Sequence, residues 1–171
     1  SERCASFTDN ISEKTVRITG RKMIPASSLS PEYCKLTLAF SESDLRFILL
    51  LPSQAWNKKI AFIGGGGFDG HIRAEEQFTW ISSPSILADH YALVSTNGGY
   101  DSPHNLSDRD YFQAAFTEDT EALLDYTYRS EHRSLPHAKR LITAFYGEAP
   151  KYTYFEGCSM GGHDGLLLSQ R

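Results

Sequence analysis

The first third of the chain alternates hydrophobic and polar residues with the period of two that β-strands show. The clearest example is residues 33–40 (YCKLTLAF), where the apolar side chains fall on one face. These side chains are Cys34, Leu36, Leu38 and Phe40. Residues 15–19 (TVRIT) and 45–51 (LRFILLL) are the neighbouring strand candidates. Because consecutive alternating segments favour antiparallel pairing, we expect the chain to open with antiparallel strands that turn one face toward water.

Further along the chain, short apolar segments alternate with helical patterns. Strands are predicted at residues 60–63 (IAFI), 91–97 (YALVSTN) and 151–157 (KYTYFEG). Helices are predicted at residues 83–91, 117–133 and 136–146, the last beginning at Pro136 and ending before Gly147. Proline suits the first turn of a helix, and glycine suits its end. Strands that alternate with helices are typical of parallel strands joined by right-handed crossovers. The sequence therefore predicts an α/β sandwich with a mostly parallel sheet flanked by helices.

The composition limits the classes of protein to which the chain can belong. Its 171 residues are 40% hydrophobic and 22% charged, which is ordinary for a globular domain. A net charge of -4 gives no broad basic field, so neither nucleic acid nor an anionic membrane is an expected partner. The longest apolar runs, such as residues 47–51 (FILLL), have the length of a strand, and no membrane span is expected.

Residues 157–161 (GCSMG) have the G-x-S-x-G spacing of a nucleophile elbow. A serine hydroxyl is a poor nucleophile until a base takes its proton, so the fold must hold it exposed and within reach of that base. A sharp turn between a strand and a helix does this, and the flanking glycines let the two elements pass closely. The new helix also points its N-terminus at the nucleophile, which favours developing negative charge. We therefore expect Ser159 to be a catalytic nucleophile, with a structural turn as the alternative.

Four consecutive glycines, Gly64–Gly67, follow the predicted strand at residues 60–63. An oxyanion hole needs two backbone N–H donors, one from the residue after the nucleophile, here Met160, and one from a loop that follows an earlier strand. Glycines allow such a loop to approach a substrate oxygen closely. A flexible turn is the alternative. A phosphate-binding loop fits less well, because no Gly-Lys-Ser/Thr follows.

Three segments together resemble one protein family. They are residues 154–171 (YFEGCSMGGHDGLLLSQR), residues 95–104 (STNGGYDSPH) and residues 56–70 (WNKKIAFIGGGGFDG). In this order they are similar to the elbow, the Gly-Gly-aromatic-Asp segment and the glycine loop of the tannase and feruloyl esterase family of α/β-hydrolases. The pair Cys4 and Cys34 is similar to an N-terminal disulfide of that family. The resemblance extends over nearly the whole chain.

The resemblance implies a secreted or periplasmic serine esterase that cleaves esters of aromatic acids such as gallate, ferulate and related hydroxycinnamates, or in one branch a terephthalate monoester. It implies no cofactor for catalysis, and a lid domain that often holds a structural calcium ion. It assigns Ser159 as the nucleophile, and the N–H groups of Met160 and of Gly65 or Gly66 as the oxyanion hole. It also pairs Cys158 with a cysteine beside the catalytic histidine, outside this chain.

None of the six histidines is in a suitable position to serve as the base. In α/β-hydrolases the triad runs Ser, then Asp or Glu, then His, so every histidine before Ser159 is in the wrong part of the fold. These are His71, His90, His104, His132 and His137, of which the last two flank the helix break predicted at Pro136. His163 lies one helical turn after the serine, beside the elbow rather than over its hydroxyl. We therefore expect the catalytic Asp and His, and the lid, to lie in C-terminal polypeptide beyond Arg171, and residues 1–171 to be the N-terminal part of the hydrolase domain.

An odd number of cysteines and two N-x-S/T glycosylation sequons, at Asn10 and Asn105, fit an exported product. We predict no metal site within the chain itself. Two alternatives to the esterase remain. One is another α/β-hydrolase, such as a peptidase or an acyltransferase, and the other is a hydrolase-fold module that binds a ligand without catalysis.

Overall fold

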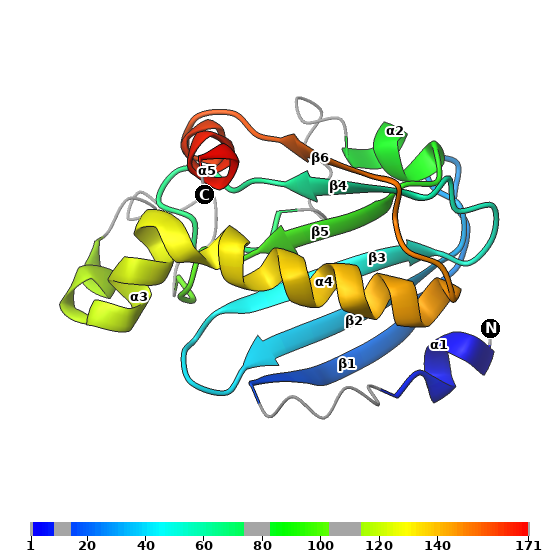
Figure 1. Cartoon of the computed structure of the whole chain (residues 1–171), viewed down its shortest axis with the longest axis horizontal. Coiled ribbons are helices and arrows are strands. Elements are labelled where there is room, and N and C mark those ends of the chain that lie inside the picture. The colour runs from blue at the N-terminus through cyan, green and yellow to red at the C-terminus, as the bar shows by residue number, and fades with distance from the viewer. Residues whose placement is uncertain (1, 9–14, 74–82, 103–113, 171) are drawn as a thin grey trace.

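A computed structural model describes residues 2–8, 15–73, 83–102 and 114–170. Within these residues the chain forms a six-stranded sheet, in the order β1-β2-β3-β5-β4-β6, with helices packed on it (Figure 1). The strands are β1 (Val16–Ile24), β2 (Tyr33–Phe40), β3 (Arg46–Pro52), β4 (Lys59–Ile63), β5 (Ala92–Thr96) and β6 (Tyr152–Glu156). The helices are α1 (Glu2–Ser6), α2 (Ser83–Ala88), α3 (Thr120–Leu124), α4 (Ser130–Tyr146) and α5 (Met160–Ser169). A 3₁₀ turn (Ala115–Glu118) precedes α3, and a π-helical turn (Asp125–Arg129) joins α3 to α4.

The sheet is mixed. β1, β2 and β3 pair antiparallel as predicted, and β3 pairs antiparallel with β5. Only β4 pairs in parallel, with β5 on one side and β6 on the other. The expectation of a mostly parallel sheet is therefore wrong for the part of the chain that the structure describes. The reason is that short connections reverse the chain between β1, β2 and β3, whereas helical crossovers join only β4, β5 and β6.

The core lies on both faces of the sheet. On β2 the alternating side chains predicted to share one face are buried, with Leu36 and Leu38 both 0% exposed. They belong to a cluster with the apolar face of α4, including Leu141 and Ile142. Leu87 of α2 packs in a separate cluster against the other face of the sheet. The two crossovers therefore cover opposite faces, which makes a layered α/β structure.

Helix α4 corrects one sequence-based expectation. Pro136 was expected to begin a helix, but α4 runs without interruption from Ser130 to Tyr146. A proline inside a helix removes one hydrogen bond and costs about 3 kcal/mol. Residues on both sides of it are buried against the sheet, among them Ser134 and Ala138, both 0% exposed. Their burial holds both halves of the helix on the same face. The predicted end of this helix is confirmed, because Gly147 caps it with a left-handed φ of 76°.

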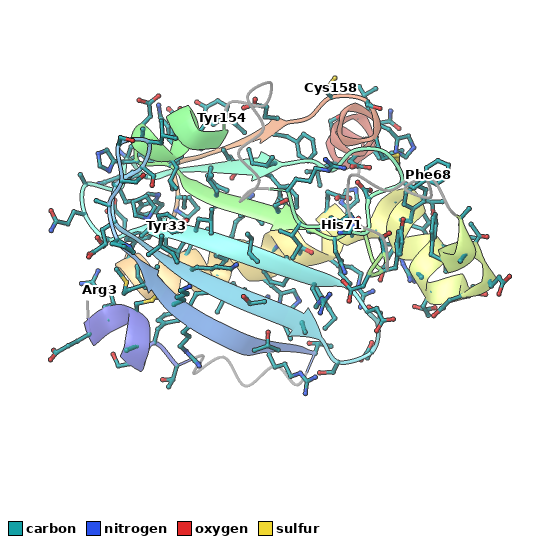
Figure 2. All side chains as sticks on the ribbon, turned by 180° about the vertical axis from the view of Figure 1, so that it is seen from behind. Arg3, Tyr33, Phe68, His71, Tyr154 and Cys158 are labelled. Carbon is teal, nitrogen blue, oxygen red and sulfur yellow. A yellow bond between two sulfur atoms is a disulfide. The ribbon has the colours of Figure 1, made fainter. Side chains whose placement is uncertain are left out.

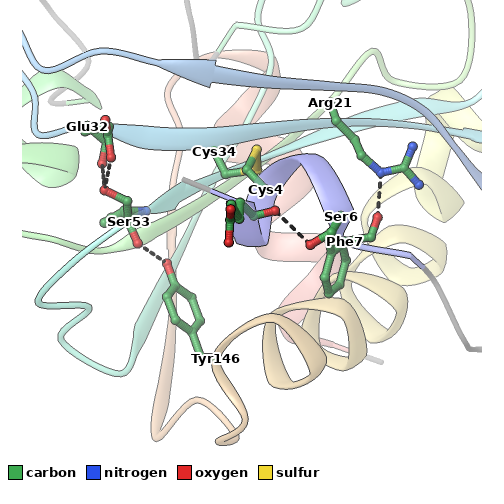
Figure 3. Close-up of a disulfide and its surroundings, with 10 residues drawn as sticks. Cys4, Ser6, Phe7, Arg21, Glu32, Cys34, Ser53 and Tyr146 are labelled. Carbon is green, nitrogen blue, oxygen red and sulfur yellow. Dashed lines mark hydrogen bonds between the residues drawn. A yellow bond between two sulfur atoms is a disulfide. The ribbon is translucent and has the colours of Figure 1, made fainter.

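A disulfide fastens the start of the chain to the sheet. Cys4 of α1 is bonded to Cys34 of β2, as the resemblance implies, and both residues are buried (Figure 3). Close by, Arg21 donates a hydrogen bond to the Phe7 carbonyl at 2.6 Å. These contacts hold α1 against β1 and β2. Within the described ranges, no helix combines the length and the apolar character needed to cross a bilayer.

Candidate active site

The turn between β6 and α5 has the shape of a nucleophile elbow. β6 ends at Glu156 and α5 begins at Met160, so the predicted order of strand, turn and helix is confirmed. Ser159 has φ 56° and ψ -120°, a conformation that residues with a side chain rarely adopt, and it is exposed. Its carbonyl accepts the first hydrogen bonds of α5, from the N–H of Gly162 at 3.0 Å and of His163 at 3.2 Å. Strain of this kind tends to persist where a function requires it.

The glycines of the G-x-S-x-G motif are required by close backbone contacts. A Cβ on Gly157 would lie 2.4 Å from the Gly161 carbonyl oxygen. A Cβ on Gly161 would lie 2.8 Å from the Gly65 carbonyl oxygen, and one on Gly64 would lie 2.8 Å from the Gly161 Cα. The elbow and the glycine loop therefore touch through their backbones, at the edge where β4 and β6 both end. In α/β sheets this edge is where ligands bind.

The glycine loop is held by two side chains. The Gly66 N–H donates to Asp69 Oδ1 at 2.9 Å, and the Gly66 carbonyl accepts from the Asp69 N–H at 3.0 Å. The Arg73 guanidinium donates to the same carbonyl at 3.1 Å. The Gly65 N–H donates a hydrogen bond to Asp164. This bond partly opposes the rise in the pKa of the Asp164 carboxyl group that burial causes. The assignment of Met160, Gly65 and Gly66 to an oxyanion hole stays a prediction.

Three carboxyl groups lie buried beneath the elbow, and sequence reasoning missed all of them. Asp69 follows the glycine loop, Glu131 belongs to α4 and Asp164 belongs to α5, and each is at most 5% exposed. Burial and the neighbouring Glu131 raise the pKa of Asp69 to about 7. Burial, Glu131 and Asp69 raise the pKa of Asp164 to about 9. Burial also raises the pKa of Glu131, which accepts hydrogen bonds from Thr96 and Ser130.

The raised pKa values predict that stability falls with rising pH. An unfolded aspartic acid ionises near its ordinary pKa of 3.8, whereas folded Asp69 and Asp164 keep their protons to about 7 and 9. The contribution of these groups is therefore fully present below about pH 4 and is lost as the pH rises through 7 and 9. In thermal unfolding at pH 5, 7 and 9, we expect the melting temperature of Asp164→Asn, relative to wild type, to increase with pH. A difference that stays constant or decreases would contradict the assignment.

An aromatic cluster borders the elbow. The Tyr126 hydroxyl lies 3.4 Å from the Met160 sulfur. The Tyr126 ring packs against Phe116 at 4.6 Å between centroids, and Phe116 stacks on Tyr100 at 4.2 Å. Phe68, at the end of the glycine loop, packs against the same rings. An aromatic core cluster therefore packs next to Met160, with Tyr100 and Phe116 buried and Phe68 and Tyr126 partly buried.

Three of the described histidines have contacts away from the Ser159 hydroxyl. His132 Nε2 lies 3.3 Å from the Leu167 carbonyl oxygen, and the His137 ring packs edge-on against Phe40. His163 is on α5, about half exposed, with Nδ1 3.4 Å from Asp164 Oδ1. In the part of the chain that the structure describes, no histidine forms a hydrogen bond with the Ser159 hydroxyl. The structure thus brings Ser159 and the glycine loop together without a base.

Of the remaining predicted positions, the structure describes Cys158 but not the two sequons or His104. Cys158 is a free, exposed thiol at the turn before α5, where it points outward (Figure 2). The sequons at Asn10 and Asn105, and His104, lie outside the described residues.

Comparison with known proteins identifies the family. Residues 36–171 match the family described as tannase and feruloyl esterase. The chain belongs to this family. Its relatives include the mono(2-hydroxyethyl) terephthalate hydrolase of Piscinibacter sakaiensis, 31% identical over 150 residues that cover 82% of the chain and 25% of that protein. Feruloyl esterase B of Aspergillus niger is 30% identical over 167 residues, which cover 95% of the chain and 28% of that protein.

Solved structures of the family share the fold. Feruloyl esterase B from Aspergillus oryzae superposes with a TM-score of 0.72 at 23% sequence identity, over 94% of the chain and 33% of that protein. An esterase from the same organism superposes with a TM-score of 0.73, also at 23% identity, over 94% of the chain and 33% of that protein. The chain therefore spans about a third or less of the length of these proteins.

Proposed function

We propose that residues 1–171 form the N-terminal part of the catalytic domain of a serine esterase that hydrolyses esters of aromatic acids. The observation that carries the proposal is the backbone of Ser159, an exposed residue held at φ 56° between a strand and a helix. Membership of a family of carboxylic ester hydrolases supports the reaction class. The elbow supplies the nucleophile for the first step of the reaction, and the glycine loop lies in contact with the elbow.

The reaction is acyl transfer in two steps. The Ser159 Oγ attacks the ester carbonyl carbon, its proton passes to a base, and the alcohol leaves with a proton to give an acyl-enzyme. Water then attacks the acyl group, which releases the acid and restores the serine. The N–H of Met160 at the start of α5, together with an N–H from the glycine loop, would stabilise the negative oxygen of each tetrahedral intermediate. The N–H groups of Gly65 and Gly66 donate to Asp164 and Asp69, so one of them would have to leave its carboxyl group to serve as that donor.

Aromatic acids are the substrate class that the surroundings of the elbow favour. Tyr126, beside Met160, and Phe68 are the partly buried rings of the aromatic cluster and the ones that a substrate ring could reach, whereas Tyr100 and Phe116 are buried behind them. Aromatic rings attract one another in stacked or edge-to-face arrangements, which contribute about 0.5–1.5 kcal/mol beyond the burial of their area. Two relatives are named as enzymes of aromatic esters, a mono(2-hydroxyethyl) terephthalate hydrolase and a feruloyl esterase.

The acid and the base would come from C-terminal polypeptide beyond Arg171, together with a lid domain that could hold calcium. Two observations support this part of the proposal. No described histidine binds the Ser159 hydroxyl, and the matched segment covers only 25–33% of the relatives compared above. We also propose that the exposed Cys158 forms a disulfide with that polypeptide and that the protein is secreted or periplasmic. The first point predicts no free thiol at Cys158 in the non-reduced protein, which peptide mass mapping would show.

The experiment that tests the function is a substrate panel on the protein that carries this chain. We expect hydrolysis of methyl gallate and methyl ferulate, with slower turnover of simple acyl esters and none of the matching amides. Ring binding should appear as a higher kcat/KM for the aromatic esters than for methyl acetate. Preferential cleavage of the amides would favour a peptidase, and transfer to an added alcohol without hydrolysis would favour an acyltransferase. Absence of turnover with every substrate, together with ligand binding, would favour a non-catalytic module.

A further inference from the structure

The glycine loop is built around one buried side chain, that of Asp69. A Cβ on Gly65 would lie 1.6 Å from Asp69 Oδ1, and a Cβ on Gly98 would lie 2.6 Å from the Asp69 Cβ. Glycine at these two positions therefore makes room for the carboxyl group. By contrast, a Cβ on Gly66 would meet only the Arg73 guanidinium, at an ordinary 3.5 Å.

Asp69 occupies this place at a cost in free energy. It is 3% exposed, and it adopts a left-handed φ of 60°, which is uncommon for a residue with a side chain. A buried carboxyl group loses hydration that its hydrogen bonds must replace. Here the replacement is the Gly66 N–H, at 2.9 Å. Strain and desolvation at one residue beside a candidate active site point to a functional reason for keeping it.

The hydrogen bonds of Asp69 determine how the Gly66 peptide is oriented. Its side chain accepts the N–H of Gly66, while its own N–H and the Arg73 guanidinium donate to the Gly66 carbonyl. The same loop touches the first turn of α5, where a Cβ on Gly161 would meet the Gly65 carbonyl oxygen. A movement of the loop would therefore change the position of its backbone relative to Gly161 and to the neighbouring Ser159.

We propose that Asp69 is a positioning residue for acyl transfer at Ser159. Its carboxyl group holds the Gly66 peptide, and through it the oxyanion loop, in the geometry that the transition state requires. The proposal rests on the proposed function, because it gives the loop its catalytic role. Displacement of a catalytic group by about 1 Å can cost 100-fold in rate, so a residue that touches no substrate can still control kcat.

The test compares Asp69→Gly with Asp69→Asn in the protein that carries this chain. Glycine and asparagine both tolerate a left-handed φ, so the two variants differ mainly in whether an acceptor remains for the Gly66 N–H. With methyl ferulate as substrate, we expect Asp69→Gly to lower kcat about 10- to 100-fold while KM stays nearly constant. We expect Asp69→Asn to keep most of the wild-type kcat.

Rates are expressed per active site, counted by complete labelling with a fluorophosphonate, so that misfolded protein does not imitate the effect. Asp125→Asn is the matched control, because Asp125 is a fully buried acid whose ion-pair partners are Arg129 and Arg133 rather than the glycine loop. It should lose thermal stability without a change in kcat per site. If Asp69→Gly does not fold, Arg73→Met is the second variant, because it removes the other side chain that holds the Gly66 peptide. We expect it to lower kcat as well.

The outcomes separate this proposal from the proposed function. A wild-type protein that neither labels at Ser159 nor hydrolyses esters would refute the proposed function itself. An active wild type with a normal kcat in Asp69→Gly would overturn the positioning role of Asp69. Equal losses of kcat in Asp69→Gly and Asp69→Asn would also overturn it, because the hydrogen-bond acceptor would then be irrelevant.

Discussion

Replacing Ser159 by alanine is expected to abolish both ester hydrolysis and covalent labelling by a fluorophosphonate in the protein that carries this chain. The physical reason is that alanine leaves no oxygen to form the acyl-enzyme or the phosphonyl adduct. Loss of the nucleophile in a serine hydrolase lowers kcat by about 10⁶-fold. The adduct mass on the peptide that contains residue 159 is the direct measurement.

Ser169 offers a matched control on the same helix. Its hydroxyl is exposed and donates to the Leu166 carbonyl at 2.7 Å, one turn before the end of α5. Ser169→Ala should label and hydrolyse esters as the wild type does. Stoichiometric labelling that persists in Ser159→Ala would show that another residue is the nucleophile, and the elbow would then be a structural turn.

The second large effect is expected for Gly161→Ala, which should destabilise the fold and reduce activity. A Cβ at this position would lie 2.8 Å from the Gly65 carbonyl oxygen and 3.1 Å from the Gly64 carbonyl carbon. Both contacts are with backbone, so α5 and the glycine loop must move apart. Overpacking of this kind costs about 1–3 kcal/mol in the free energy of unfolding. The same movement separates the elbow from the loop, so kcat should fall as well.

Gly162→Ala is the control for that experiment, because it makes the same chemical change one residue later. A Cβ on Gly162 would meet only the Gly157 carbonyl oxygen, at 3.9 Å. Alanine stabilises a helix interior relative to glycine by about 0.5–1 kcal/mol, so this variant should be as stable as the wild type or more stable. Chemical denaturation of both variants measures the difference. Equal stability of the two variants would mean that α5 and the glycine loop are not in tight contact.

The buried acids Asp69 and Asp164 should make the stability of this site depend on pH. Asp69 and Asp164 hold protons at pH values where exposed carboxyl groups are ionised, because burial penalises their charged forms. The glycine loop donates hydrogen bonds to both of these carboxyl groups. Measurements of stability and of kcat over the same pH range would therefore show how closely the cluster and the loop are linked.

Local patterns in the sequence were sufficient for the elements and for the elbow. The alternation in residues 33–40 reproduces β2 to the residue, and Gly147 caps α4 as expected. The spacing of G-x-S-x-G is itself local, because the strand, the turn and the helix follow one another along the chain. Pro136 misled the prediction, since the cost of a proline in a helix is a local quantity and the burial on both sides of it is not.

The sequence by itself determined the order of the strands, the disulfide partners implied by the resemblance, and the position of Ser159 between a strand and a helix. It did not predict α1, and it placed the break between the two long helices at Pro136. Only the tertiary structure decided that the sheet is mixed, and that Asp69, Glu131 and Asp164 meet beneath the elbow. These acids are 33 or more residues apart in the chain. They come from the loop after β4, from α4 and from α5, and their desolvation depends on neighbours that no local pattern records.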